Sequence, residues 1–308
     1  MCTSPAIVSR RDLKSDTTTF APSKWPIDSP TIQEYKCVTN HAFQQHFAGR
    51  TSGRDLMRHI RFVVVMSFVF LFAAFAEGQA MRTWVSGVGD DINPCSRTAP
   101  CKTFAGAISK TAKNGEINCL DPAGFGAVTI TKSITIDCED TQGSILSAGT
   151  NGVIINITDA TDSKKAVKIR GISINGAATG INGIRILAAN SVNVEEVVID
   201  GVTQHGISVE GSSQVVVKNS AIRSNAGSGI NGFTADGAID IMVTNSLLNG
   251  NGTGVTASNG TTVRLSGNTI AFNRTGLAAP TGKIISFRNN SIDGNGTNGA
   301  PTSTVAQQ

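Results

Sequence analysis

A short motif recurs along the second half of this 308-residue chain and restricts its possible folds. A glycine followed by an aliphatic residue occurs five times with spacings of 23, 23, 25 and 22 residues, at Gly183, Gly206, Gly229, Gly254 and Gly276. A second motif, which ends in asparagine, runs in phase with the first and covers residues 217–225, 243–251, 265–273 and 287–295. Weaker copies lie at residues 169–174 and 194–199. Such a period is typical of folds in which each unit packs only against its neighbours.

Each repeat contains three short runs in which apolar and polar residues alternate, separated by Gly, Asn and Ser. Alternation with a period of two predicts strands with one buried face. Three strands in about 23 residues fit one turn of a parallel β-helix, where each strand pairs with its copy in the next coil at about 4.8 Å. The predicted interior is a column of aliphatic side chains, which no single coil can bury alone.

An asparagine ends each copy of the second motif, at Asn225, Asn251, Asn273 and Asn295. We interpret these residues as structural, because asparagine tolerates the left-handed backbone of a turn. Stacked copies also predict hydrogen bonds along the rod. The alternative is a functional role, as glycan ligands or as N-x-S/T sugar acceptors.

These repeats resemble the right-handed parallel β-helix of the pectin-lyase-like superfamily, and residues 84–108 resemble its N-terminal capping segment. The resemblance covers residues 82–297. It implies an all-β, single-stranded right-handed parallel β-helix, a solenoid of roughly seven coils of 22–25 residues with a short N-terminal capping helix. Thr103 is the predicted N-cap of that helix. We therefore expect a β-helix domain over residues 81–298 and a polar C-terminal tail over residues 299–308.

The long apolar run of the chain is residues 62–76. A helix of that length spans about 22 Å, whereas a bilayer core needs about 30 Å. Arg58 and Arg61 precede the run and small residues follow it, which predicts a secretory signal peptide over residues 57–80. Residues 1–56 are then a disordered or mis-assigned upstream extension. The alternative is an uncleaved signal-anchor, the one predicted contact with a membrane.

Four cysteines follow this segment, at Cys95, Cys101, Cys119 and Cys138. In an exported chain they predict two disulfides, for which three connectivities exist. Cys95–Cys101 and Cys119–Cys138 are favoured because short separations are easily bridged. A zinc site is the alternative, but CxxC spacing is absent.

The charge balance argues against nucleic-acid binding. Of the net charge of +4, residues 1–80 carry +3 (nine Lys/Arg, six Asp/Glu), and residues 81–308 carry +1 (17 against 16). A near-neutral body cannot neutralise many phosphates. We expect no nucleic-acid partner and no firm cofactor.

A polysaccharide lyase, the chemistry implied by the resemblance, would need carboxylates around Ca²⁺ and a Lys or Arg base. The candidate metal ligands are Asp137, Glu139, Asp140, Glu195, Asp200 and Glu210. The candidate bases are Arg185, Lys218 and Arg223. Each also fits a solvated surface.

A hydrolase would need paired carboxylates. Residues 203–206 resemble the Gly-His-Gly segment of polygalacturonases, with Gln204 in place of the first glycine, and make His205 a further catalytic candidate. The acidic pairs expected on earlier coils are absent; Asn175 and Asp200 stand there singly. A lone histidine at a strand start is more often a turn or surface residue.

Turns between the later repeats are short, and the predicted outward row on one face is small and mixed: Arg185, Ser208, Asn231, Thr256 and Ala278. Residues 139–165 are expected to form an irregular insertion that walls one side. We therefore predict an exported β-helix in the cell envelope or secreted, which is non-catalytic and binds polysaccharide or cell-surface glycan, or serves a structural role. The alternatives are a Ca²⁺-dependent polysaccharide lyase and a self-assembling adhesin.

Overall fold

The computed structural model describes residues 54, 57–64 and 78–306. The chain divides into two units, Met1–Ala74 and Phe75–Gln308. In the first unit, the described residues are helical. The rest of the predicted extension and residues 65–77 of the predicted signal segment lie outside the described residues. No helix in the described ranges combines the length and apolar character needed to cross a bilayer.

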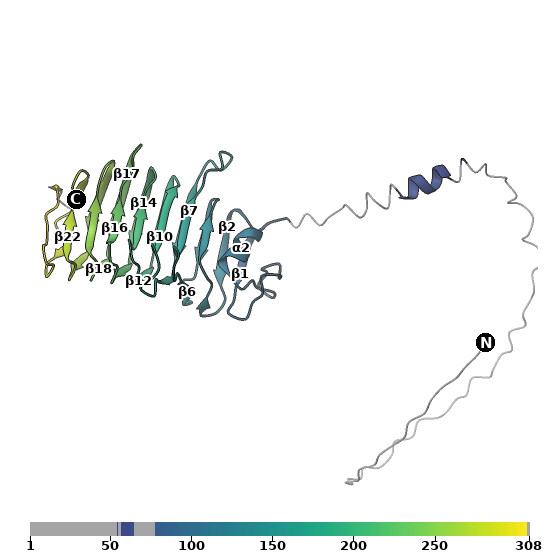
Figure 1. Ribbon diagram of the computed structural model, residues 1–308, viewed down its shortest axis with the longest axis horizontal. Helices are drawn as coiled ribbons and strands as arrows, with labels where there is room; N and C mark the ends of the chain where they lie inside the picture. The colour runs from purple at the N-terminus through teal and green to yellow at the C-terminus, as the bar shows by residue number, and fades with distance from the viewer. Residues whose placement is uncertain (1–53, 55–56, 65–77, 307–308) are drawn as a thin grey trace, which may run out of the picture. The chain divides into compact units, whose positions relative to one another are not determined.

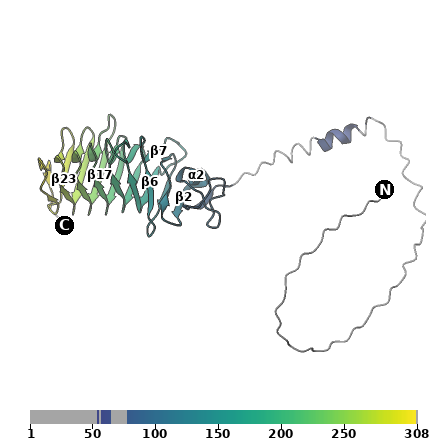
Figure 2. The same cartoon turned by 60° about the horizontal axis from the view of Figure 1, so that its bottom comes forward.

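The second unit is a parallel β-solenoid with three sheets, as predicted (Figure 1). Sheet A has ten strands: β1 (Ala80–Val85), β2 (Thr111–Cys119), β5 (Ile134–Asp137), β8 (Ala166–Arg170), β11 (Ser191–Glu195), β14 (Ser213–Lys218), β17 (Ile239–Thr244), β20 (Thr261–Ser266), β23 (Lys283–Ser286) and β25 (Ser303–Thr304). Successive members pair in parallel, so each coil adds one strand (Figure 2).

The other two sheets repeat this rule. Sheet B has eight strands: β3 (Ala123–Gly124), β6 (Gly143–Leu146), β9 (Ile172–Asn175), β12 (Val198–Asp200), β15 (Ala221–Arg223), β18 (Leu247–Asn249), β21 (Thr269–Ala271) and β24 (Ser291–Ile292). Sheet C has seven: β4 (Val128–Ile130), β7 (Val153–Asn156), β10 (Ile184–Ala188), β13 (Ile207–Val209), β16 (Ser228–Gly232), β19 (Thr253–Ala257) and β22 (Thr275–Ala278). The seven strands of sheet C match the predicted number of coils.

The aliphatic column predicted for the interior is present. The residue after each repeated glycine pairs with its copy in the next coil and is buried: Ile184, Ile207, Ile230, Val255 and Leu277. Stacking of the coils thus removes these apolar side chains from water, which is the main stabilising contribution in such a fold.

The repeated glycines have a packing role. A Cβ on Gly229 would lie 2.8 Å from the carbonyl oxygen of Gly254 and 3.0 Å from Nδ2 of Asn251. A Cβ on Gly206 would lie 2.3 Å from Cγ2 of Ile222. These distances are too short for a side chain, so the close approach of coils at this corner requires glycine.

The repeated asparagines form a ladder of hydrogen bonds, as the stacking predicted. The backbone N–H of Asn225 donates to Oδ1 of Asn251, and that of Asn251 donates to Oδ1 of Asn273. Asn273 donates in the same way to Asn295. The buried amides therefore satisfy backbone groups at the corner between sheets B and C.

The predicted reason for asparagine at this turn is wrong. The left-handed residue lies one position earlier in each coil, at Ser224, Gly250, Phe272 and Gly294, with φ between 56° and 70°. Asparagine occupies the position after the left-handed residue because its amide supplies both a hydrogen-bond donor and an acceptor within a closed corner.

The N-terminal cap follows the prediction. Helix α2 (Phe104–Lys110) begins after Thr103, whose side chain accepts the N–H of Gly106. Phe104 is buried and its ring centroid lies 5.1 Å from that of Phe125. Asp91 accepts the backbone N–H groups of Lys102 and Thr103. The first coil is thereby closed by a helix.

The predicted tail is partly structural. The N–H of Leu277 donates to the carbonyl oxygen of Asn298, and residues 303–304 form β25 at the edge of sheet A. The N–H of Val305 donates to the carbonyl oxygen of Ser286. Residues 303–305 therefore pair with the edge strand of sheet A.

Both favoured disulfides are present, Cys95–Cys101 beside the cap and Cys119–Cys138 between the ends of β2 and β5. Two disulfides are typical of an oxidising compartment outside the cytoplasm.

Candidate functional site

The outer face of sheet C carries the predicted row of side chains. Register pairs join Arg185 to Ser208, Ser208 to Asn231, Asn231 to Thr256 and Thr256 to Ala278. The row therefore runs along the rod at the spacing of the coils.

Arg185 and Glu210 meet at one end of this row. Nε of Arg185 lies 2.8 Å from Oε1 of Glu210, and its NH2 nitrogen lies 2.7 Å from Oε2. Ser208 donates its hydroxyl to Oε1 at 3.0 Å. The paired hydrogen bonds fix both charged groups in one plane, which is the strongest common geometry for this pair.

The electrostatics of this pair follow from its geometry. The hydrogen bond from Arg185 lowers the pKa of Glu210, and the hydroxyl of Ser208 acts in the same direction. The hydrogen bond to Glu210 raises the pKa of Arg185. Both groups are therefore held in their charged forms at neutral pH.

His205 lies one residue before the repeated Gly206, close to this pair. Its Nδ1 accepts the backbone N–H of Ser228 at 3.0 Å. Burial lowers the pKa of His205, while the charge of Glu210 opposes that shift. The imidazole is therefore neutral at pH 7, with its proton on Nε2 and its Nδ1 occupied by the backbone.

Three of the candidate metal ligands surround an arginine on sheet A. Arg170 is 3.2 Å from Oδ2 of Asp137 and 3.4 Å from Oε2 of Glu195, and it also pairs with Glu139. Burial acts to lower the pKa of Arg170, but Asp137 and the other carboxylates raise it above the ordinary value. These three carboxylates are thus engaged by a guanidinium of the chain itself.

The remaining candidates lie apart. Asp200 pairs with Arg223 across sheet B, with 3.1 Å between Oδ2 and Nε. Asp140 lies in the turn before β6 and has φ of 63°. Lys218 is exposed at the end of β14, beside Glu195 in register. Within the described ranges, no three His, Cys, Asp or Glu side chains are close enough to share a metal ion.

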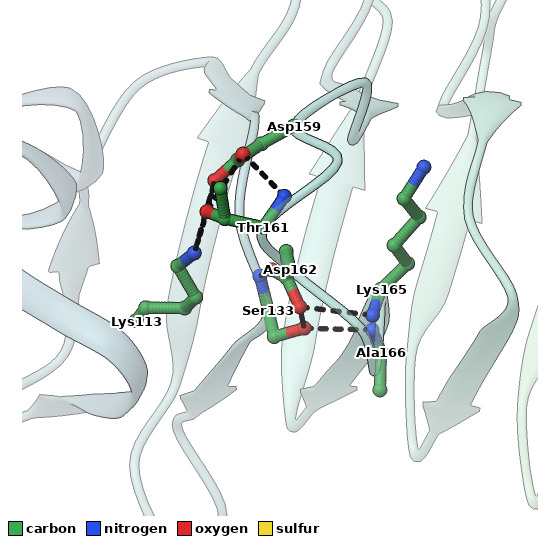
Figure 3. Close-up of polar contacts among 7 residues, drawn as sticks. All are labelled: Lys113, Ser133, Asp159, Thr161, Asp162, Lys165 and Ala166. Atoms are coloured by element: carbon green, nitrogen blue, oxygen red, sulfur yellow. Dashed lines mark hydrogen bonds and ion pairs between the residues drawn. The ribbon is translucent and has the colours of Figure 1, made fainter.

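The irregular insertion is shorter than predicted. Residues 139–165 include β6 and β7, and only residues 157–165 form an extended corner between sheets C and A. Figure 3 shows how this loop is held. Asp162 accepts both the backbone N–H and the hydroxyl of Ser133, and the N–H of Lys165. Asp159 pairs with Lys113 at 2.9 Å.

Asp162 was not singled out from the sequence, because no local motif marks it. Its side chain is only 2% exposed. Burial acts to raise its pKa, but the hydrogen bonds from Ser133 and Lys165 lower the pKa below the ordinary value. The charged carboxylate therefore anchors the loop.

Two longer corners lie on either side of the coils that carry Arg185 and Glu210. Between sheets C and A, residues 157–165 and residues 233–238 form the longest connections, whereas residues 189–190 and 210–212 form short ones between them. Arg185 and Glu210 belong to the coils with the short corners. The Arg185–Glu210 pair therefore lies between two larger loops along the rod.

Comparison with known proteins agrees with this architecture. Residues 151–305 match the family described as the right handed beta helix region. The crystal structure of pectate lyase Pel9A is similar with a TM-score of 0.44 and 12% sequence identity, over 75% of this chain and 78% of that chain. No curated protein matches the sequence. The family model matches half of the residues, and the structure has the three parallel sheets of such a solenoid. The chain therefore belongs to the right-handed β-helix family.

Proposed function

We propose that the protein is an exported, non-catalytic β-helix that binds glycan along the outer face of sheet C. The observation that carries this proposal is the two-point bond between Arg185 and Glu210. In this bond the candidate base, Arg185, and the candidate metal ligand, Glu210, are hydrogen-bonded to each other.

A lyase base must give up its proton near the working pH. Arg185 has a raised pKa because of Glu210, and Arg170 has a raised pKa because of its surrounding carboxylates. Both shifts move these groups away from base chemistry. The carboxylates bonded to them would have to leave a guanidinium before binding Ca²⁺, which costs a charge-assisted hydrogen bond.

The same row suits binding. Asn231 and Thr256 are half-buried neighbours in this row and carry an amide and a hydroxyl group, and polar groups of this kind orient a bound ligand. Ser208 is only 2% exposed, and its hydroxyl is bonded to Glu210. The two disulfides support export, because such bonds persist in oxidising compartments.

Affinity electrophoresis tests this proposal. The protein is run in gels that contain soluble xylan, β-glucan, galactomannan or polygalacturonate. We expect retardation in at least one gel, weakened by Asn231→Ala. Asn193→Ala is the matched control, because Asn193 lies on the outer face of sheet A. Retardation by none of these polymers, or equal loss in both variants, contradicts the proposal.

A further inference from the structure

Phe272 has an unusual backbone conformation for an aromatic residue. Its φ is 57°, in the left-handed region that disfavours bulky side chains. The same position in other coils is Gly201, Ser224, Gly250 or Gly294. A phenylalanine therefore stands where most coils use a residue with little or no side chain.

Packing within the chain does not explain this choice. Phe272 is 75% exposed. Its ring edge lies against Gly294, where an added Cβ would be 3.4 Å from Cε1. Gly250 and Gly294 carry no side chains at the same turn of the adjacent coils, so neither residue adds a side chain that could pack on the ring. A strained backbone conformation that is not compensated by side-chain packing is typical of a functional position.

A second, independent feature lies on the preceding coil, opposite the residue before Phe272. Oδ1 of Asn249 is buried and has no hydrogen-bond partner. Asn249 pairs in register with Ala271, the residue before Phe272. A buried acceptor without a donor is costly, so a hydrogen-bond donor is expected at this atom.

The surroundings favour a sugar over a protein partner. Arg274 and Asp293, from the same corner in this coil and the next, are exposed and charged. A protein hot spot would instead place an aromatic anchor among apolar neighbours. A pyranose ring has an apolar C–H face and a rim of hydroxyl donors, which match one aromatic surface and one free acceptor.

We propose that Phe272 and Asn249 form a glycan subsite at the corner between sheets B and C. A pyranose ring stacks on Phe272, and one of its hydroxyls donates to Oδ1 of Asn249 after a rotamer change of that side chain. This inference rests on the proposed glycan-binding function and extends its binding surface from the outer face of sheet C to this corner.

Phe272→Gly separates this role from a structural one, because glycine fits the left-handed turn. With the polysaccharide that retards the wild type, we expect the dissociation constant to rise about tenfold or more in Phe272→Gly and to stay near wild type in Phe272→Trp. Asn249→Ala should weaken binding in the same direction. The melting temperature of Phe272→Gly should equal or exceed that of the wild type.

Ile92→Ala is the control, because Ile92 is an exposed apolar residue of the N-terminal cap and belongs neither to sheet C nor to this corner. Wild-type binding by Phe272→Gly, or a clearly lower melting temperature, overturns the subsite while leaving the proposed function intact. Retardation of the wild type by no polysaccharide overturns both.

Discussion

Asn251 joins three coils through one side chain. Its backbone N–H and its Nδ2 both donate to Oδ1 of Asn273, at 2.9 and 3.1 Å, and Nδ2 also donates to the carbonyl oxygen of Ile222 at 3.0 Å. Asn251 is only 3% exposed, so water cannot replace these bonds. The ladder thus stabilises the corner that leads into sheet C and positions the outward row.

Asn273→Ala tests the ladder. The substitution leaves the N–H and Nδ2 of Asn251 without their acceptor, and each unsatisfied buried donor costs about 1–3 kcal/mol. We expect the free energy of unfolding to fall by about 2 kcal/mol or more, measured by urea denaturation. Asn289→Ala is the control, since Asn289 is exposed. A loss no larger than that of the control would show that the ladder is not stabilising.

Gly229→Ala tests the close approach of coils. The added Cβ would lie 2.8 Å from a backbone oxygen that cannot move without its coil. We expect a loss of stability of about 1–3 kcal/mol from overpacking. Gly124→Ala, where the nearest atom would be 3.7 Å away, should leave the melting temperature unchanged or raise it. Equal melting of both variants would contradict the packing role of the repeated glycine.

Asp162 makes the stability of the loop depend on pH. The ordinary pKa of aspartate, which the unfolded chain has, is about 3.9, and hydrogen bonds hold the folded value lower. Its contribution is therefore complete above about pH 4 and is lost as the pH falls through the folded pKa. We expect Asp162→Asn to flatten the fall in stability between pH 6 and pH 2, measured by urea midpoints.

The exposed Asp236 provides the control for that experiment. Asp236→Asn should leave the slope of stability against pH as in the wild type. If Asp162→Asn has the wild-type slope as well, the carboxylate does not anchor the loop.

The two disulfides should differ in their contributions. Cys119 and Cys138 are 19 residues apart and Cys95 and Cys101 are six apart. In the chain-entropy account, the longer loop contributes about 3 kcal/mol and the shorter one about 2 kcal/mol. Serine pairs replacing each disulfide, compared by thermal unfolding, should rank in this order. The reverse order would indicate that native contacts rather than chain entropy set the effect.

The repeat made the fold predictable, because each coil obeys the same local rule and a period of 22–25 residues survives in the sequence. The row through Arg185, Ser208 and Asn231 followed from that register. The bond between Arg185 and Glu210 could not be predicted from that register. It joins a residue of strand β10 to the residue that follows strand β13 of the next coil. Asp162 lies in an irregular loop, where no periodicity places a side chain.

The left-handed turn residue was assigned one position too late for a related reason. Composition alone favours asparagine for that backbone, and the amide ladder that uses Asn251 instead becomes visible only when the coils stack. Contacts between coils therefore determine which turn position asparagine occupies, and the turn propensity of the residue alone does not.

The proposal that this β-helix is non-catalytic is tested most directly by the ultraviolet absorbance of unsaturated products. The protein is incubated with polygalacturonate, alginate or chondroitin in Ca²⁺. With Arg185 bonded to Glu210 and Arg170 bonded to Asp137, Glu139 and Glu195, we predict no rise in absorbance on any of these polymers. A rise that depends on Ca²⁺ and is abolished by a chelator would contradict the account and identify a polysaccharide lyase.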